Sequence, residues 1–383
     1  MQARYLISFV LILTSCTAAQ IPTEGPTTTM SPTMVEAQKP PTSTPTITPT
    51  RTPTPLPAVL SGTSVSIPTA AISIDNISHV HQLAKWESGE QSIPVDSLAF
   101  SPDNTWLLSG LDDGNIQVWR VSNGSLEHTL VGDGIHATSI AFSPDGTRLA
   151  VGSWPFSVKL WSWTLEGLGT QIRSITNDAD GPPVAFSPDG KWLVTMYPGN
   201  LGYRNGSDGA KERFWASSLL GDSTTFAFSP DGAIIAVGTN GGKVHLVQVS
   251  DQKVLDTLVG NPSKIDSLVF SSDGTKIAAG FFDGSIKVWS MPGGMLELSL
   301  DAIGPNPQCY SCYVPVSFSP DSTLLAGGSV DERIRIWRVS DGTLMQTLTG
   351  HTKAIRSLTF SSDGIFLSSG SDDGTVRLWG VGP

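Results

Sequence analysis

Residues 141–146 read Ala-Phe-Ser-Pro-Asp-Gly, and two identical copies and four close variants of this stretch occur elsewhere in the chain. Their phenylalanines are separated by 42, 44, 42, 42, 48 and 42 residues. The seven positions are Phe100, Phe142, Phe186, Phe228, Phe270, Phe318 and Phe360. A nearly fixed period of this length indicates a repeat architecture, and each unit is long enough for four short strands with their turns.

Within each unit, turn residues alternate with short strands. Ser-Pro-Asp-Gly is typical of a turn, because Pro presets φ at the second position and Gly suits the last. A strand of small residues follows, such as residues 149–152, and then a second turn that often contains Asp-Gly. The third strand alternates strictly, as in Ile116-Gln117-Val118-Trp119, which predicts one buried face. The repeats therefore predict an all-β domain.

These motifs resemble the WD-repeat family, and the resemblance covers residues 77–383. It implies a seven-bladed β-propeller with four-stranded antiparallel blades. The Trp-Asp dipeptide that gives the family its name is absent, because the Trp that ends the third strand is never followed by Asp here. In the fourth unit Val247 replaces this Trp, and in the third unit we align Tyr203 with it.

The last unit stops after its third strand, four residues beyond Trp379. Residues 77–86 align with the outer strands of the other units, so we expect this N-terminal strand to complete the last blade. Such pairing removes an open sheet edge and closes the ring. The propeller domain is therefore expected to span residues 61–383.

The buried polar tetrad of the family is complete only in the last unit, as His351, Ser369, Asp373 and Trp379. The resemblance implies that His351 bridges Asp373 and Ser369. A catalytic His351 is the alternative, and we expect the structural role.

The N-terminus reads as an export signal over residues 1–15, with Arg4 before a short apolar run. Leu13-Thr14-Ser15-Cys16 resembles the lipobox of bacterial lipoproteins, which implies that Cys16 is lipidated and becomes the first mature residue. An ordinary signal peptide cut near Ala18-Ala19 is the alternative. Residues 16–60 are rich in Pro and Thr and are expected to form an extended, disordered tether. The expected location is extracytoplasmic, with membrane contact through the lipid anchor only.

Composition and motifs argue against several kinds of site. The formal net charge of −11 disfavours nucleic acid as a partner, which needs a basic surface. The six histidines occupy different strand positions, so we expect no ligand cluster, no metal and no cofactor. We find no nucleophile elbow and no phosphate-binding loop. The chain is therefore not expected to be an enzyme.

Cys309 and Cys312 lie in the longest connection, between the fifth and sixth units. Outside the cytoplasm we expect them to form a small loop disulfide. A redox-active pair and a metal site are the alternatives.

The resemblance to WD-repeat propellers implies that one face of the ring carries the turns between second and third strands together with the links between blades. Aromatic residues at these positions are candidates for partner contact, since aromatic side chains are favoured at interfaces. The alternative is that they only pack over neighbouring turns. Asp112, Asp331 and Glu332 add negative charge to this face. The binding-face candidates are Trp154, Phe156, Tyr197, Phe281, Phe282, Tyr310, Tyr313 and Asp331.

These features favour a lipid-anchored scaffold of the cell envelope that binds a protein, peptide or glycan. The alternative is an extracytoplasmic hydrolase or lyase that acts at the central channel. A pocket with convergent acids and His would favour the enzyme, and a broad aromatic face would favour the scaffold. The fold alone does not distinguish them.

Overall fold

The computed structural model describes residue 65 and residues 67–382, apart from residue 90 and the segments 133–135, 165, 177–180, 198–199, 217–221 and 304–312. The chain divides into two units, Met1–Pro53 and Thr54–Pro383, and every described residue lies in the second. The predicted signal peptide and tether lie outside the described residues. Within the described part, no helix is long and apolar enough to span a membrane.

The described residues form seven four-stranded antiparallel sheets, the blades, as the repeats predict. The first blade consists of β2 (Val95–Phe100), β3 (Trp106–Leu111), β4 (Ile116–Arg120) and β5 (Leu126–Leu130). The second consists of β6 (Ala137–Phe142), β7 (Arg148–Ser153), β8 (Ser157–Thr164) and β9 (Gly167–Thr176). The third consists of β10 (Gly181–Phe186), β11 (Trp192–Tyr197), β12 (Asn200–Asn205) and β13 (Lys211–Ala216).

The remaining blades repeat this order. The fourth consists of β14 (Ser223–Phe228), β15 (Ile234–Thr239), β16 (Lys243–Gln248) and β17 (Val254–Val259). The fifth consists of β18 (Ile265–Phe270), β19 (Lys276–Phe281), β20 (Ser285–Ser290) and β21 (Leu296–Asp301). The sixth consists of β22 (Val316–Phe318), β23 (Leu324–Gly328), β24 (Arg333–Arg338) and β25 (Leu344–Thr349). The seventh contains β26 (Ile355–Phe360), β27 (Leu367–Ser371) and β28 (Thr375–Val381).

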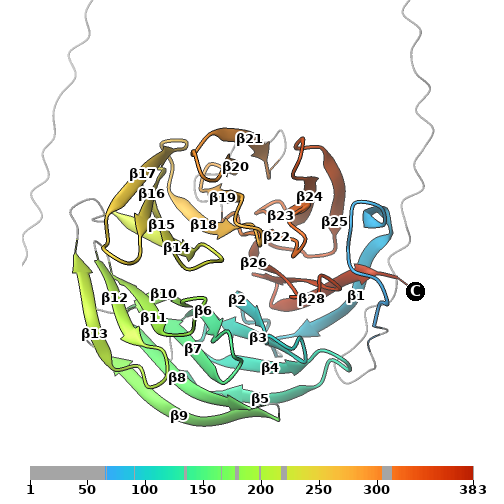
Figure 1. Cartoon of the computed structure of the whole chain (residues 1–383). Helices are drawn as coiled ribbons and strands as arrows, with labels where there is room; N and C mark the ends of the chain where they lie inside the picture. Colours follow the sequence, from blue (N-terminus) through green and yellow to red (C-terminus); the bar gives the residue numbers. More distant parts are fainter. Residues whose placement is uncertain are drawn as a thin grey trace, which may run out of the picture. The chain divides into compact units, whose positions relative to one another are not determined.

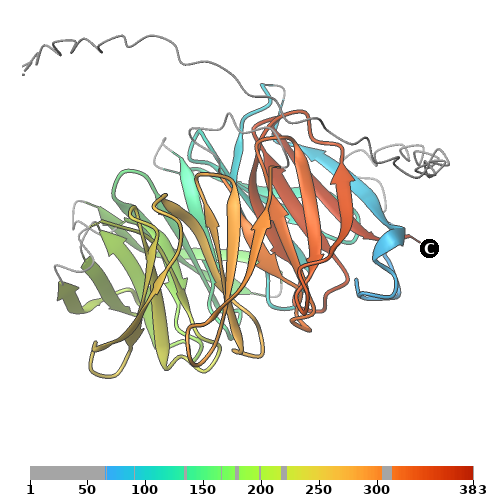
Figure 2. The ribbon, with the colours of Figure 1, turned by 90° about the horizontal axis from the view of Figure 1, so that it is seen from above.

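The N-terminal strand completes the seventh blade, which confirms the predicted closure. A short 3-10 helix, η1 (Ile77–His79), leads into β1 (Val80–Glu87), which pairs antiparallel with β28. Figure 2 shows the blue N-terminal strand beside the red C-terminal sheet. The strand therefore starts at Val80, three residues later than the sequence predicts. The first strand of each repeat lies innermost, and each inner strand contacts the next around the ring, including β26 with β2 (Figure 1).

The apolar core lies between neighbouring blades. Trp86 of β1 stacks on Trp119 of the first blade, with ring centroids 5.4 Å apart and an interplanar angle of 18°. Between the first and second blades, Trp106 and Trp163 meet edge to face, with ring centroids 6.3 Å apart. Burial of each large apolar side chain stabilises the fold by about 1.5–3 kcal/mol. Adjacent blades therefore stabilise one another, and a missing blade edge would expose this core.

The turn after each repeat Phe is held by a hydrogen bond between its Ser and Asp side chains. In the second blade, Ser143 Oγ donates to Asp145 Oδ1 at 2.6 Å, and the backbone N–H of Thr147 donates to the same oxygen at 3.0 Å. These hydrogen bonds hold the pKa of Asp145 below its usual value. Where Gly is missing, Asn104 and Ser322 adopt the left-handed conformation, with φ of 57° and 61°. The turn thus keeps its shape after the substitution.

The third blade differs from its predicted alignment by one residue. In the first blade Leu107 pairs with Trp119, whereas the equivalent Leu193 pairs with Arg204. The alignment of Tyr203 with the Trp position is therefore wrong. Neighbouring residues of a strand point to opposite faces, so Tyr203 is buried on the other side of the sheet, with 0% exposure.

Candidate functional site at the channel mouth

A cavity of about 470 Å³ opens where the inner strands begin. It is lined by β2, β6, β18, β26 and the start of β22, including Asp96, Asp266 and Arg356, and is therefore part of the central channel. A second cavity of about 310 Å³ involves the Ser-Pro turns at the opposite end, and the described residues that line it include no ionisable side chain. The first end, which we call the channel mouth, carries the charged chemistry.

The turns between second and third strands lie at this same end. The backbone N–H of Asp112 donates to the carbonyl of Pro94 at 3.0 Å, and that of Phe282 donates to the carbonyl of Lys264 at 2.9 Å. Pro94 and Lys264 directly precede β2 and β18. The backbone thus brings these turns beside the starts of the inner strands, where the sequence places the binding face.

Two of the predicted aromatic residues form a row with two cations at the channel mouth. The rings of Phe282 and Tyr313 lie 5.4 Å apart in an edge-to-face arrangement. Lys264 Nζ lies 4.2 Å from the centroid of Phe282, and the Arg356 guanidinium lies 4.2 Å from that of Tyr313. This cationic–aromatic row, Lys264, Phe282, Tyr313 and Arg356, crosses from the fifth blade to the seventh. Cation–π contacts of this kind contribute about 0.5–1 kcal/mol each at exposed sites.

Carboxylates flank both cations of the row. Lys264 Nζ lies 3.5 Å from Asp266 Oδ1, and Arg356 Nε lies 2.7 Å from Asp372 Oδ1. Burial raises the pKa of Asp266, and the charges of Lys264 and Arg356 partly oppose this rise. The cations are thus fixed in position by ion pairs while their aromatic neighbours remain half-buried.

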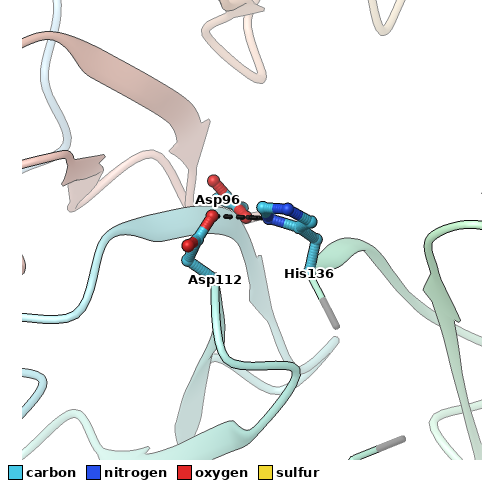
Figure 3. Close-up of side chains that lie close together, drawn as sticks. All are labelled: Asp96, Asp112 and His136. Atoms are coloured by element: carbon cyan, nitrogen blue, oxygen red, sulfur yellow. Dashed lines mark ion pairs between the residues drawn. The ribbon is translucent and has the colours of Figure 1, made fainter. Parts of the chain in front are cut away.

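In the first blade, which adjoins the blade of Arg356, Asp96, Asp112 and His136 converge at the channel mouth (Figure 3). Asp96 is the second residue of β2, Asp112 follows β3, and His136 directly precedes β6 of the next blade. His136 Nδ1 lies 2.5 Å from Asp112 Oδ1 and 3.4 Å from Asp96 Oδ2. Burial, together with the charge of Asp112, raises the pKa of Asp96 to about 6, although Arg356 and His136 act in the opposite direction. The expectation that no histidine joins a cluster of possible ligands is wrong for His136.

A repeat comparison contains the signal that points to these residues. Two positions of the unit, four residues before and twelve residues after the repeat Phe, lie at the channel mouth, and their residue types differ among the units. The Ser-Pro-Asp turn at the opposite end barely changes among the units. These two positions hold Asp96 and Asp112 in the first blade, Asp266 and Phe282 in the fifth, and Arg356 and Asp372 in the seventh. The repeat therefore varies where the channel opens and is nearly constant at the opposite end, which is typical of a scaffold that carries a site on its loops.

The other predicted face residues have different environments. Trp154 and Phe156, in the turn between β7 and β8, are 58% and 41% exposed. The backbone N–H of Trp154 donates to the carbonyl of His136 at 3.1 Å, which places this turn next to the acidic cluster. The inclusion of Phe281 in the face is wrong, because its side chain is fully buried and packs 6.5 Å from the ring of Trp289. As the last residue of β19, it faces the apolar core, whereas Phe282 lies in the turn.

Some predicted residues lie outside the described part or in ion pairs. Cys16, Cys309, Tyr310 and Cys312 lie outside the described residues, as does the side chain of Tyr197. Asp331 pairs with Arg335, with Oδ2 2.6 Å from Nη2, and the Asp331 side chain is 24% exposed. Its charge is thus largely engaged within the sixth blade.

The polar tetrad of the seventh blade is assembled as a buried network. His351 Nδ1 lies 3.0 Å from Asp373 Oδ2, and His351 Nε2 lies 2.7 Å from Ser369 Oγ. Trp379 Nε1 donates to the same Ser369 oxygen at 2.9 Å. Because a carboxylate only accepts, neutral His351 donates through Nδ1 and accepts the Ser369 proton at Nε2. This arrangement satisfies all four side chains and gives His351 a structural role.

The electrostatics of the tetrad agree with this protonation state. Burial lowers the pKa of His351, although Asp373 acts in the opposite direction. Burial disfavours ionisation of Asp373, but hydrogen bonds from His351, Thr375 and the backbone N–H of Thr352 outweigh it and hold the pKa of Asp373 well below its usual range. The network is therefore a neutral imidazole beside a carboxylate.

Comparison with known proteins agrees with this architecture. The family described as WD domain, G-beta repeat matches residues 82–120, 124–162, 252–290, 310–338 and 342–380. Pre-mRNA-processing factor 19 of Oryza sativa subsp. japonica is 25% identical over 229 residues, which are 59% of this chain and 43% of that protein. Serine-threonine kinase receptor-associated protein of Gallus gallus is 24% identical over 200 residues, 52% of this chain and 56% of that protein. An uncharacterized WD repeat-containing protein of Synechocystis sp. is 29% identical over 115 residues, 29% of this chain and 31% of that protein.

These matches cover only part of each relative, and this chain spans less than half the length of Pre-mRNA-processing factor 19. They therefore support the repeat architecture and not a shared activity. The five repeat matches and the seven four-stranded blades together support a WD-repeat propeller.

Proposed function

We propose that this chain is a lipid-anchored scaffold of the cell envelope that binds a protein, peptide or glycan over the channel mouth. Its similarity to WD-repeat proteins supports an interaction scaffold. The observation that carries the proposal is the cationic–aromatic row, because aromatic side chains and arginine are the residues that most often dominate binding energy. The exposed Trp154 extends the aromatic surface toward the second blade.

The row is well suited to a partner because it is already ordered. Arg356 is held by Asp372 at 2.7 Å, so little side-chain entropy is lost when a ligand stacks on Tyr313. We expect the partner to contact the solvent-exposed parts of Phe282 and Tyr313, which are both half-buried.

The anchor rests on the lipobox that ends at Cys16. Two or three acyl chains give stable membrane attachment, at about 0.8 kcal/mol for each buried methylene. Labelling of the full-length chain in cells with an alkyne fatty acid tests it. The wild-type chain should carry the label and Cys16→Ala should not. Equal labelling of both chains would contradict the anchor.

Site-specific photocrosslinking tests the partner surface. A photoreactive phenylalanine analogue is placed at position 282 of the full-length chain and, as a control, at Leu344 on outer strand β25, where the side chain is 49% exposed. In intact cells, position 282 should yield a discrete crosslinked species that Tyr313→Ser diminishes. The same adducts from positions 282 and 344 would refute a dedicated surface.

An enzyme at the central channel is the second candidate. The specific observation in its favour is the convergence of Asp96, Asp112 and His136 beside a cavity, with the pKa of Asp96 raised to about 6 by burial and by Asp112. Peptide and polysaccharide mixtures incubated with the wild-type chain would then be cleaved, and Asp96→Asn would abolish cleavage without loss of the crosslink from position 282. Cleavage that survives Asp96→Asn would exclude this site.

A further inference from the structure

We propose that Asp96, Asp112 and His136 bind a divalent transition-metal ion at the channel mouth. One possible ligand atom from each of the three side chains lies within 4.8 Å of the others. Two carboxylates and an imidazole are ligands that Zn²⁺ accepts at about 2.0–2.2 Å, and Mn²⁺ and Fe²⁺ bind similar sets. Figure 3 shows both carboxylates and the imidazole turned toward one another.

Asp96 provides independent support for an occupant. Its side chain is only 10% exposed, and Oδ2 is a buried oxygen that accepts no hydrogen bond from the described residues. This oxygen points toward His136, whose Nδ1 is 3.4 Å away. Buried polar atoms nearly always have a partner, and one without a partner calls for an unseen water or ion. A cation bound between the two carboxylates would satisfy this oxygen.

A proton on His136 does not explain the geometry equally well. The imidazole has one hydrogen on Nδ1, and the 2.5 Å contact directs it to Asp112 Oδ1. Asp96 Oδ2 lies 3.4 Å from the same nitrogen, beyond the usual range of an N–H···O hydrogen bond, and is left without a donor. A metal ion has no such restriction, because it accepts Nδ1 and both carboxylate oxygens at once. Neutral His136 then acts as a ligand instead of a donor.

The surroundings leave room for the ion and for a further ligand. Asp96 lines the cavity of about 470 Å³, so three protein ligands would leave a coordination position that faces the channel. Arg356 is the nearby cation that acts on Asp96, and it opposes metal binding. Its charge is partly neutralised by Asp372 at 2.7 Å. Two carboxylates at the site therefore outweigh it.

Titration calorimetry with Zn²⁺ alone tests the proposal on the full-length chain after treatment with a chelator. We expect binding at this site to weaken at least tenfold in Asp96→Asn, Asp112→Asn and His136→Ala. Asp113→Asn is the matched control, since it removes the same charge from the same turn, while its amide oxygen can still accept from the backbone N–H of Asn115 at 2.9 Å. This control should bind Zn²⁺ like the wild-type chain.

A second measurement separates coordination from attraction to negative charge. Co²⁺ in place of Zn²⁺ should give visible absorption that disappears in His136→Ala, whereas Mg²⁺ should compete weakly because it prefers oxygen ligands. Circular dichroism of each metal-free variant verifies that the propeller remains folded. Zn²⁺ binding that is unchanged in all three ligand variants, or equally weakened in Asp113→Asn, would overturn the proposal. So would a chain that binds no Zn²⁺.

Discussion

Replacement of Trp86 and Trp379 separately by Phe should destabilise the propeller by different amounts. Both side chains are buried, at 1% and 2% exposure, and both lie in the blade that closes the ring. Trp379 Nε1 donates to Ser369 Oγ at 2.9 Å, whereas Trp86 Nε1 is buried with no acceptor among the described residues. The substitution therefore removes a hydrogen bond at Trp379, whereas at Trp86 it removes a buried N–H group that has no acceptor among the described residues.

The expected difference follows from these two environments. Loss of part of a buried indole costs roughly 1–2 kcal/mol at either position, from about 0.8 kcal/mol per methylene-sized group. Trp379→Phe also loses a hydrogen bond worth about 1 kcal/mol, which brings its cost to about 2–3 kcal/mol. Trp86→Phe removes a buried unpaired N–H, whose desolvation costs about 1–3 kcal/mol, so its net effect is near zero. The two variants should differ by about 2 kcal/mol or more.

Urea unfolding of the full-length chain, followed by far-UV circular dichroism, measures this difference. The m-values of the two variants should agree, so that the midpoints report stability alone. Phe at position 86 keeps an aromatic ring against Trp119, whose indole lies 5.4 Å from that of Trp86. Equal midpoints for Trp86→Phe and Trp379→Phe, or a lower midpoint for Trp86→Phe, would refute the reasoning.

Three further predictions follow from the closure, the corrected face and the tetrad. A chain that starts at residue 90 lacks β1 and should melt at a lower temperature than one that starts at residue 60, and equal melting temperatures would contradict the role of β1. Phe281→Ala should lower the free energy of unfolding by about 3–5 kcal/mol because the Phe281 side chain is buried, whereas Phe282→Ala should lower it by less than about 1 kcal/mol. Similar urea midpoints for the two variants would contradict the different environments of these residues. Burial lowers the pKa of His351 below 6.5, so the unfolded chain takes up a proton that the folded chain refuses, and stability should fall by up to about 1.4 kcal/mol per pH unit below pH 6.5. His351→Gln should remove this part of the pH dependence, and identical stability curves between pH 5 and 8 would count against a neutral buried histidine.

Most of the fold could be predicted because its information is local and repeated. The Ser143–Asp145 hydrogen bond at 2.6 Å forms within three residues, so the turn is determined by its own sequence. Strict alternation then assigns the faces of the strands. The closing strand could be predicted because residues 77–86 align with the outer strands of the other units, and β1 pairs with β28 as expected. Its start at Val80 instead of Ile77 reflects a 3-10 turn that alternation does not reveal.

Two errors show that the local sequence does not always determine the face of a strand on which a side chain lies. The third blade has no Trp at the end of its third strand, and Arg204 lies 18 residues after Phe186 instead of the usual 19. A one-residue difference reverses the face of every side chain, so Tyr203 was assigned to the wrong side. Phe281 and Phe282 illustrate the same limit, because adjacent aromatic residues at a strand end differ only in the direction of the side chain.

The position of His136 beside Asp96 and Asp112 could not be predicted from motif spacing, for a different reason. Asp96, Asp112 and His136 come from two blades, and only the ring brings His136 to the first blade. In the seventh blade the equivalents of Asp96 and Asp112 are Arg356 and Asp372, which neutralise each other at 2.7 Å. With Asp in place of Arg, the same two positions hold like charges, which repel unless a positive group is supplied from outside the pair.

The seventh blade thus serves as an internal control for the first. Because the first two strands of each blade pair in the same register, Asp96 and Arg356 occupy equivalent positions and differ in charge. His136 supplies one nitrogen from the neighbouring blade, yet Asp96 Oδ2 still accepts no hydrogen bond from the described residues. In the seventh blade the same two positions form an ion pair, whereas in the first blade they hold two carboxylates, one largely buried and one half-buried. The first blade is therefore less stable at these positions than the repeat allows. That loss is understandable if the site binds a cation, and a variant Asp96→Arg, which restores the pattern of the seventh blade, should then be more stable in the absence of metal and unable to bind Zn²⁺.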